Sequence, residues 1–187
     1  MTSEPSPTPR IEEFREYLMV LARSRIGQDR PLNLEVSDIV QETLLEAHKK
    51  LDQFRGTEPA SMAAWLRQML AYNITDRMRA MGRQKRDVSR EVSFSPDSLD
   101  ESSARMEQWV AAEQTSPSRK LMHMEKVLAV AGAIEKLPDS QGEAIRMRYI
   151  EGLSLAEIAS RLGKSETAIA GLLKRGLESL RGQLRLA

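Results

Sequence analysis

The 187-residue chain contains no cysteine, and this absence excludes several kinds of chemistry at once. Disulfide bonds, thiolate nucleophiles and cysteine-ligated zinc or iron–sulfur sites are impossible. Only two histidines occur, His48 and His123, so a metal centre would need carboxylates as its other ligands. The sequence also lacks a glycine-rich phosphate loop and a nucleophile motif. We therefore expect a protein that is not an enzyme and that uses no metal and no cofactor.

Long apolar runs and aromatic residues are scarce as well. No run of about 18 apolar residues exists, and residues 1–9 lack the apolar stretch of a secretion signal. Aromatic residues make up 4% of the chain, whereas Leu, Ala, Met, Glu and Arg are abundant, a mixture that favours helices. The composition predicts an all-α protein in the cytoplasm, without membrane insertion.

Apolar residues recur at helical spacing in two separate groups. The first group predicts helices over 10–26 and 36–51, followed by a loop and a third helix over 61–81. The second group begins at Leu121 and is interrupted by Pro138, after which three more helices are expected. The chain is therefore expected to form two small helical domains.

The charge changes sign between the two groups, although the net charge of the whole chain is only +1. Residues 77–90 hold six basic side chains against one acidic, and residues 91–116 hold six acidic against one basic. The acidic part is rich in serine and has too few apolar residues to fold alone. The predicted division is a disordered tail over 1–9, a domain over 10–86, a flexible acidic linker over 87–119 and a domain over 120–187.

Two capping boxes occur near the end of the chain, at Ser140–Glu143 and Ser154–Glu157. The second box predicts a helix over 154–162, then a turn at Gly163 and a helix over 165–182, the arrangement of a helix-turn-helix. A major groove accepts one such helix, whose first residues then face the bases. These first residues are Lys164, Ser165, Glu166 and Thr167, and the candidate phosphate contacts are Lys174, Arg175 and Arg181. The alternative is an ordinary helical hairpin with solvated charges.

Two further surfaces stand out in the first group. A basic cluster ends the third helix, near Trp65 and a loop that holds Phe54 and Arg55, a combination that suits single-stranded nucleic acid. Trp65 could equally be a core residue, and the basic cluster could complement the helix dipole. On the second helix Asp38, Gln41, Glu42 and Glu46 form an acidic stripe, which is either a solvated face or a docking surface for a basic protein helix.

Short motifs are distributed over both groups in a distinctive order. The first group contains SDIVQET at 37–43, LDQFRG at 51–56, AWL at 64–66 and NITDR at 73–77. The second contains LP at 137–138, YIEGLSLAEIA at 149–159 and LGKSE at 162–166. Together they resemble the extracytoplasmic-function (ECF) group of bacterial RNA polymerase sigma factors, in the sigma-70 family. The resemblance covers residues 10–86 and 120–184, with that family's linker between them.

The resemblance implies a sigma factor that binds core polymerase, through the beta-prime coiled coil and the beta flap, and directs initiation at promoter DNA. The expected polymerase contacts are Asp38, Ile39, Gln41 and Glu42. The expected contacts with the minus-ten element, where strands separate, are Phe54, Arg55, Met62, Trp65, Asn73, Arg77, Arg79, Arg83, Lys85 and Arg86. The expected minus-thirty-five contacts are Lys164, Ser165, Glu166, Thr167, Ala168, Gly171, Lys174 and Arg175.

The chain departs from the family pattern at two positions of the last helix. Ala170 and Leu172 stand where the family commonly has a lysine and an arginine. An anti-sigma factor is a possible further partner. Two other functions remain open on the sequence: a helix-turn-helix regulator that binds DNA without joining polymerase, and a helical adaptor that binds only protein.

Overall fold

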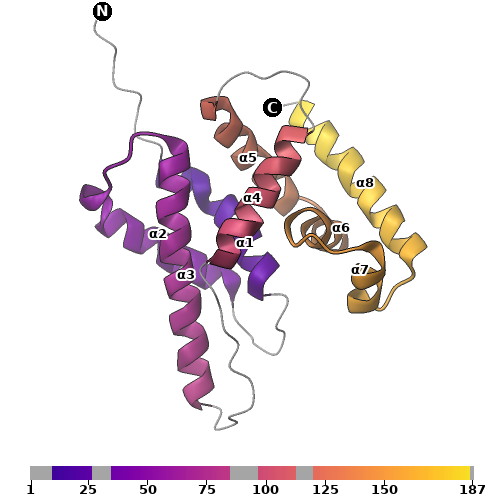
Figure 1. Ribbon diagram of the computed structural model, residues 1–187, viewed down its shortest axis with the longest axis horizontal. Coiled ribbons are helices and arrows are strands. Elements are labelled where there is room, and N and C mark those ends of the chain that lie inside the picture. The colour runs from indigo at the N-terminus through magenta and orange to yellow at the C-terminus, as the bar shows by residue number, and fades with distance from the viewer. Residues whose placement is uncertain (1–9, 27–34, 85–96, 113–119, 186–187) are drawn as a thin grey trace, which may run out of the picture.

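The structure, a computed structural model, describes residues 10–26, 35–84, 97–112 and 120–185. These residues contain no strand, which confirms the all-α prediction. The helices, in chain order, are η1 (Ile11–Phe14), α1 (Arg15–Ile26), α2 (Val36–Lys49), η3 (Leu51–Gln53), α3 (Pro59–Gln84), α4 (Asp97–Ala112), α5 (Lys120–Glu135), α6 (Asp139–Ile145), η4 (Arg146–Ile150), α7 (Leu155–Leu162) and α8 (Glu166–Arg185) (Figure 1).

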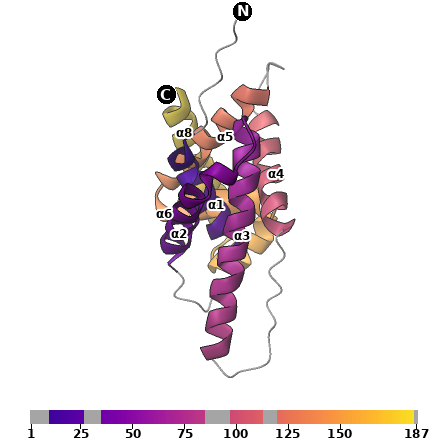
Figure 2. The same ribbon diagram turned by 90° about the vertical axis from the view of Figure 1, so that its left-hand side faces the viewer.

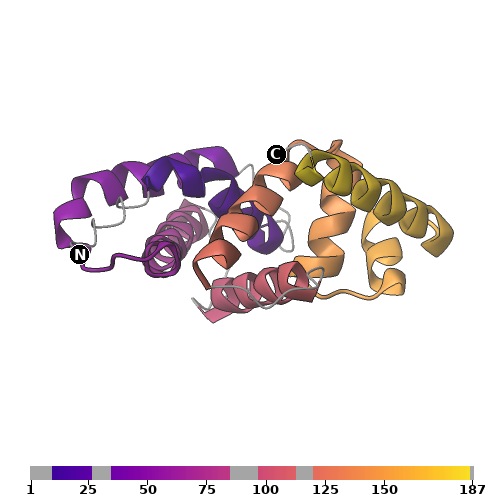
Figure 3. The same cartoon turned by 90° about the horizontal axis from the view of Figure 1, so that it is seen from above.

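Helix α1 is the central element, since it packs against α2, α3, α4 and α5. Helices α2 and α3 lie at one end of the molecule, α6, α7 and α8 lie at the other, and α4 and α5 lie between them (Figures 1 and 3). The end of α3 that leads to Gln84 projects beyond the other helices (Figure 2). Both predicted domains therefore belong to one packed body in this structure.

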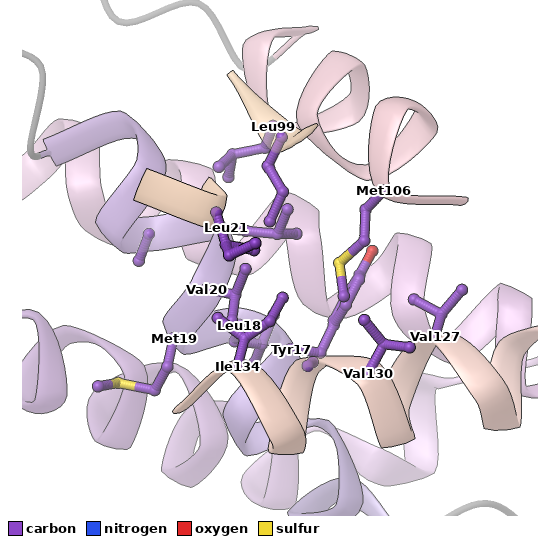
Figure 4. Close-up of a cluster of buried hydrophobic side chains, with 14 of the residues drawn as sticks. Tyr17, Leu18, Met19, Val20, Leu21, Leu99, Met106, Val127, Val130 and Ile134 are labelled. Carbon is purple, nitrogen blue, oxygen red and sulfur yellow. The ribbon is translucent and has the colours of Figure 1, made fainter. Parts of the chain in front are cut away.

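One apolar cluster connects the two ends of the molecule. Tyr17 and Leu18 of α1 face Met106 of α4 and Val130 and Ile134 of α5 (Figure 4). Burying one aliphatic side chain of this size contributes about 1.5–3 kcal/mol to stability. The apolar residues that predicted a helix over 10–26 are thus buried in a core to which the second half of the chain also contributes.

The prediction of a flexible linker over 87–119 is wrong for residues 97–112, which form α4. Leu99, Met106 and Val110 of this helix are buried. They repeat at spacings of seven and four, so they share one face, and that face packs on α1 and α5. The segment has few apolar residues of its own, but tertiary contacts supply the burial that an isolated segment would lack.

The predicted capping box at Ser140 is also wrong, because α6 begins earlier. The carbonyl oxygen of Pro138 accepts the first backbone bonds, from Gln141 at 2.8 Å and Gly142 at 3.0 Å. No side chain caps this helix. Ser140 therefore lies within the first turn, where its hydroxyl is not positioned as an N-cap.

Candidate nucleic-acid and protein interfaces

The exposed face of α2 carries the predicted acidic stripe. Asp38, Gln41 and Glu42 are exposed, as their spacing of three and four residues predicts. Leu45 continues the same face and is 55% exposed, although it is a large apolar residue. Ile39, which was predicted as a polymerase contact, is only 1% exposed and faces the core, so it cannot belong to this surface.

Sequence reasoning missed Leu45 as a surface residue. The signal that would have identified it is its position three residues after Glu42, on the polar side of the helix. Its neighbour Leu44 is half-buried against the core, so Leu44 is the residue of this turn that belongs to the core-facing apolar stripe. Leu45 therefore adds one exposed apolar side chain to the polar stripe of α2.

Helices α2 and α3 are connected by polar contacts. The Asn73 side-chain amide donates to the Thr43 hydroxyl at 3.0 Å and to Glu46 at 3.3 Å. Lys50 donates to the other oxygen of Glu46 at 2.6 Å, and this hydrogen bond is the main reason why the pKa of Glu46 lies below its usual range. Asn73 was predicted as a DNA contact, but in this structure its amide holds the two helices together.

Arg77 connects the two predicted surfaces. Its guanidinium lies 3.0 Å from the Glu42 carboxylate, so a predicted DNA contact and a predicted polymerase contact form an ion pair. Both side chains are about half exposed, and an ion pair of this kind contributes little stability. Arg77 can therefore leave Glu42 for a phosphate at small cost.

The remaining basic residues of α3 extend along its projecting end. Arg79 is more exposed than Arg77 and lies 3.8 Å from Asp76 in a loose pair. Arg83 belongs to the last turn of α3, whereas Lys85 and Arg86 lie outside the described residues. Of the basic residues predicted for this surface, Arg77 and Arg79 are the two whose side chains the structure locates, and both lie on the exposed side of α3.

The loop before α3 holds an aromatic pair. The rings of Phe54 and Trp65 lie 5.1 Å apart between centroids, tilted by 34°, and both side chains are partly exposed. Gly56 makes this arrangement possible, because a Cβ atom there would lie 2.5 Å from the Phe54 ring and 2.7 Å from Cβ of Ser61. The structure therefore brings the two predicted aromatic contacts together on one partly open surface.

Two other predicted residues of this region have different surroundings. Arg55 is exposed beside the aromatic pair, where a basic contact is expected. Met62 is fully buried, because it lies on the same face of α3 as Leu66 and Leu70, which are also in the core. Met62 was predicted as a minus-ten contact, and its burial excludes a direct contact in this structure.

The predicted helix-turn-helix is formed by α7 and α8. Ser154 and Glu157 form the predicted capping box, in which the Ser154 hydroxyl accepts from the Glu157 N–H. Gly163 ends α7 in the left-handed conformation, with φ 61° and ψ 38°. The Ser165 hydroxyl then accepts from the Ala168 N–H at 3.2 Å and caps the start of α8. Local signals therefore fix the turn between the two helices.

The first turns of α8 present the predicted contact residues to solvent. Seven of the eight are exposed and one is partly exposed: Lys164, Ser165, Glu166, Thr167, Ala168, Lys174 and Arg175, with Gly171 the partly exposed one. The Arg175 guanidinium lies against Gly171, where a Cβ atom would be 3.3 Å from it. Leu172 is only 9% exposed, so this position packs in the core, whereas Ala170 is exposed.

Neither a metal-binding cluster nor a membrane-spanning helix is found among the described residues. Among them, no group of three or more His, Asp and Glu side chains is placed to hold a metal ion. None of the helices in the described part is both long and apolar enough to cross a bilayer.

Comparison with known proteins gives two family matches. Residues 10–84 match the family model for sigma-70 region 2, and residues 128–180 match the family model for sigma-70 region 4. The first match covers η1 to α3, with the acidic face and the aromatic pair. The second begins in the middle of α5 and continues through the helix-turn-helix into α8.

Curated proteins with similar sequences carry consistent names. The ECF RNA polymerase sigma factor SigD of Mycobacterium tuberculosis is 24% identical over 174 residues, which cover 93% of this chain and 74% of SigD. The ECF RNA polymerase sigma-E factor of Escherichia coli is 30% identical over 127 residues, 67% of this chain and 61% of that protein. A solved structure of the sigma factor RpoE in complex with the anti-sigma factor NepR, from Bartonella quintana, is 22% identical, covers 94% of this chain and 92% of its own, and has a TM-score of 0.34.

Proposed function

Because the chain belongs to the ECF group of the sigma-70 family and is an RNA polymerase sigma factor that acts in transcription initiation, we propose a role for each of its surfaces. The α2 face binds core polymerase, the α3 surface with its aromatic pair binds the minus-ten element, and the first turns of α8 bind the minus-thirty-five element. The observation that carries this proposal is that one helical body exposes an acidic face on α2 together with basic side chains on α3 and at the start of α8.

The α2 face suits a protein partner and not DNA. Asp38 and Glu42 would repel phosphates, whereas a basic helix of the beta-prime coiled coil would complement their charge. Leu45 adds an exposed apolar side chain beside these charges. An apolar residue surrounded by polar ones is the arrangement of an interface with an apolar centre and a polar rim. The docking surface therefore consists of Asp38, Gln41, Glu42 and Leu45.

The α3 surface suits an opened DNA strand. Phe54 and Trp65 offer partly exposed aromatic faces on which an unstacked base can stack, and Arg55 lies beside them. Arg77 and Arg79 supply positive charge for the phosphates of the same strand. Stacking and phosphate contacts together offset the lost base pairing, so strand separation requires no hydrolysis of ATP.

The α8 surface suits duplex DNA. An exposed helix start with Ser165, Glu166 and Thr167 can enter a major groove, and Lys174 and Arg175 can bind the flanking phosphates. Leu172 is buried in the core and cannot contact a phosphate. Lys174 and Arg175 therefore make the phosphate contact that the family commonly makes from position 172. We propose that the protein works in the cytoplasm and carries out no chemistry of its own.

The decisive experiment reverses the charge of the docking surface. We expect Asp38→Lys combined with Glu42→Lys to lower the affinity for core polymerase more than about 30-fold, because like charges then face the basic partner. Binding is measured by pull-down with purified core enzyme, and function by promoter-dependent transcripts. A matched control is Glu178→Lys, the same change at an exposed position of α8, which should bind core normally.

The ion pair with Arg77 requires a second control. Glu42→Lys alone places two cations together, so its effect could arise from a disturbed contact between α2 and α3. The exchange of both charges, Glu42→Lys with Arg77→Glu, restores the pair while keeping the reversed charge on the α2 face. The proposal is wrong if the exchanged variant binds core polymerase as tightly as the unmodified protein does.

The same experiment separates the other two functions. A helix-turn-helix regulator would bind promoter DNA but would produce no promoter-dependent transcript with core polymerase. A helical adaptor would bind neither the core enzyme nor the DNA through these surfaces. Only a sigma factor supplies initiation.

A further inference from the structure

Helix α3 exposes one large aromatic side chain, Tyr72, that belongs to none of the surfaces described above. Tyr72 is 71% exposed, the highest fraction among the large hydrophobic residues of the described part of the chain. Within that part, its hydroxyl forms no hydrogen bond and its ring stacks on no other ring. Because a mostly solvated ring gains little from burial, the packing of the fold does not explain this residue.

Tyr72 lies in one row with Trp65 and Arg79, since each is seven residues from the next. Seven residues make about two turns of an α-helix, to within about 20° of the same direction, and advance about 10.5 Å along its axis. These three side chains form the outer row of α3. The row begins at the Phe54–Trp65 pair and runs toward the end of α3 that projects from the body (Figure 2).

The neighbouring helices leave the outer row uncovered. Helix α4 is attached to α3 through Arg67, which donates to Asp100 at 2.7 Å, and α2 is attached through Arg77, which donates to Glu42 at 3.0 Å. Arg67 and Arg77 are each five residues from Tyr72, which places them about 140° away from it around the helix, one on either side. Tyr72 therefore lies opposite both contacts and faces solvent.

The charges at the two ends of the outer row favour a strand of nucleic acid as its partner. Arg79 is 72% exposed, and its pair with Asp76, at 3.8 Å, is loose enough to give way to a phosphate. Arg55 is exposed at the other end, beside the aromatic pair. Aromatic side chains between cationic ones are the arrangement that holds single-stranded nucleic acid. The proposed polymerase surface on α2 is acidic instead.

We propose that Tyr72 stacks on a second base of the opened strand, in addition to the base that the proposed function assigns to Phe54 and Trp65, and this inference rests on that function. The rise of about 10.5 Å between Trp65 and Tyr72 corresponds to about three steps of about 3.4 Å along a DNA strand. Tyr72 therefore holds a base about three nucleotides from the first one. Since every base has an aromatic face, this contact lengthens the stretch of strand that is held open without reading its sequence.

The promoter affinity of the complete holoenzyme tests this role, with a promoter duplex that the holoenzyme itself selects from genomic DNA. We expect Tyr72→Ala to weaken binding about 5-fold or more, the lower end of the range for one base–aromatic stack. Tyr72→Leu should do the same, because leucine keeps apolar area but has no aromatic face, and Tyr72→Phe should recover most of the affinity. Gln108→Ala, at an exposed position of α4, should bind like the unmodified protein. Circular dichroism checks that each variant keeps its helices.

The salt dependence of binding separates stacking from charge. Tyr72→Ala should leave the slope of log affinity against log salt unchanged, because the ring neutralises no phosphate. Arg79→Ala, in the same row, should reduce the size of this slope by about 0.7, the value for one phosphate of a single strand.

A fluorescent base locates the contact on the strand. 2-Aminopurine is placed at successive positions of the opened strand, and its emission increases where a substitution removes a stacked ring. The position that responds to Tyr72→Ala should lie about three nucleotides from the position that responds to Phe54→Leu.

Every result of these measurements supports or overturns the role of Tyr72. Unchanged promoter affinity in Tyr72→Ala overturns it, as does a Tyr72→Leu protein that binds like Tyr72→Phe or a strand on which no position responds. An equal loss of affinity for core polymerase without DNA would place the ring in a protein interface and would also overturn it. If the unmodified protein forms no promoter complex with core polymerase, the proposed function fails and this role fails with it. A promoter complex that is indifferent to Tyr72 leaves the proposed function intact.

Discussion

The α3 and α8 surfaces are both proposed to bind DNA, but they are held in place in different ways. The α8 surface depends on neighbours in the chain: Ser154 caps α7, Gly163 forms the turn and Ser165 caps α8. The α3 surface depends on residues far away in the chain, since Arg77 pairs with Glu42, 35 positions earlier. The first surface is therefore fixed by local backbone geometry, and the second by tertiary contacts.

This difference has a consequence for binding. The exposed residues at the start of α8 can meet DNA without breaking a tertiary contact, so their affinity should not depend on the rest of the protein. Arg77 must instead break its ion pair with Glu42 before its guanidinium can bind a phosphate, so the two partners compete for it. Because Glu42 also lies on the proposed polymerase surface, polymerase binding and release of Arg77 toward DNA are expected to assist each other.

The largest effect is expected from Gly56, which tests the tertiary character of the α3 surface. In Gly56→Ala the new Cβ atom would lie 2.5 Å from the Phe54 ring and 2.7 Å from Cβ of Ser61, so the ring or the first turn of α3 must move. Overpacking of this kind costs about 1–3 kcal/mol. Urea unfolding measures the loss, and the fluorescence of Trp65 in a Trp109→Phe background reports whether the aromatic pair has separated.

Gly132 of α5 provides the control for this substitution. A Cβ atom there meets nothing within 4 Å, and alanine is the better helix former, so Gly132→Ala should stabilise the protein by about 0.5–1 kcal/mol. A Gly56→Ala protein with unchanged stability and unchanged Trp65 fluorescence would show that the loop relaxes freely, and the contrast between the two surfaces would be lost.

A smaller effect is expected at Gly163, where only the backbone matters. Gly163 has φ 61° and open space around it, so Gly163→Ala should cost about 1–2 kcal/mol through left-handed strain alone. Gly163→Asn should recover part of this loss, because asparagine tolerates that conformation. Gly182→Ala in α8, also in open space but in a helical conformation, should have the opposite sign. Equal effects at Gly163 and Gly182 in urea unfolding would contradict the local account.

The same contrast explains what could be predicted from the sequence. The turn at Gly163 and the capping box at Ser154 were predicted because their signals lie within a few residues of each other. The contacts of Asn73 and the burial of Met62 were not, since they depend on which helix packs on which. Helix α4 was missed for the same reason: its apolar residues are too few to indicate a helix until the partner surface on α1 and α5 is known.

The smallest effect is a pH dependence at the capping box, which tests how local the α7–α8 unit is. The Ser154 N–H and hydroxyl both donate to the Glu157 carboxylate, at 2.8 and 2.7 Å, and these bonds hold the pKa of Glu157 below its usual range. A depressed carboxyl pKa means that the stabilisation is present at neutral pH and is lost as the pH falls through the pKa of the folded state. The difference in unfolding free energy between the unmodified protein and Glu157→Gln should therefore shrink from pH 7 toward pH 3.5, and Glu178→Gln, at an exposed position outside the box, should show no such trend. A difference that stays constant over this range would mean that Glu157 acts only through hydrogen-bond geometry, which the amide reproduces, and that its charge plays no part in fixing the start of α7.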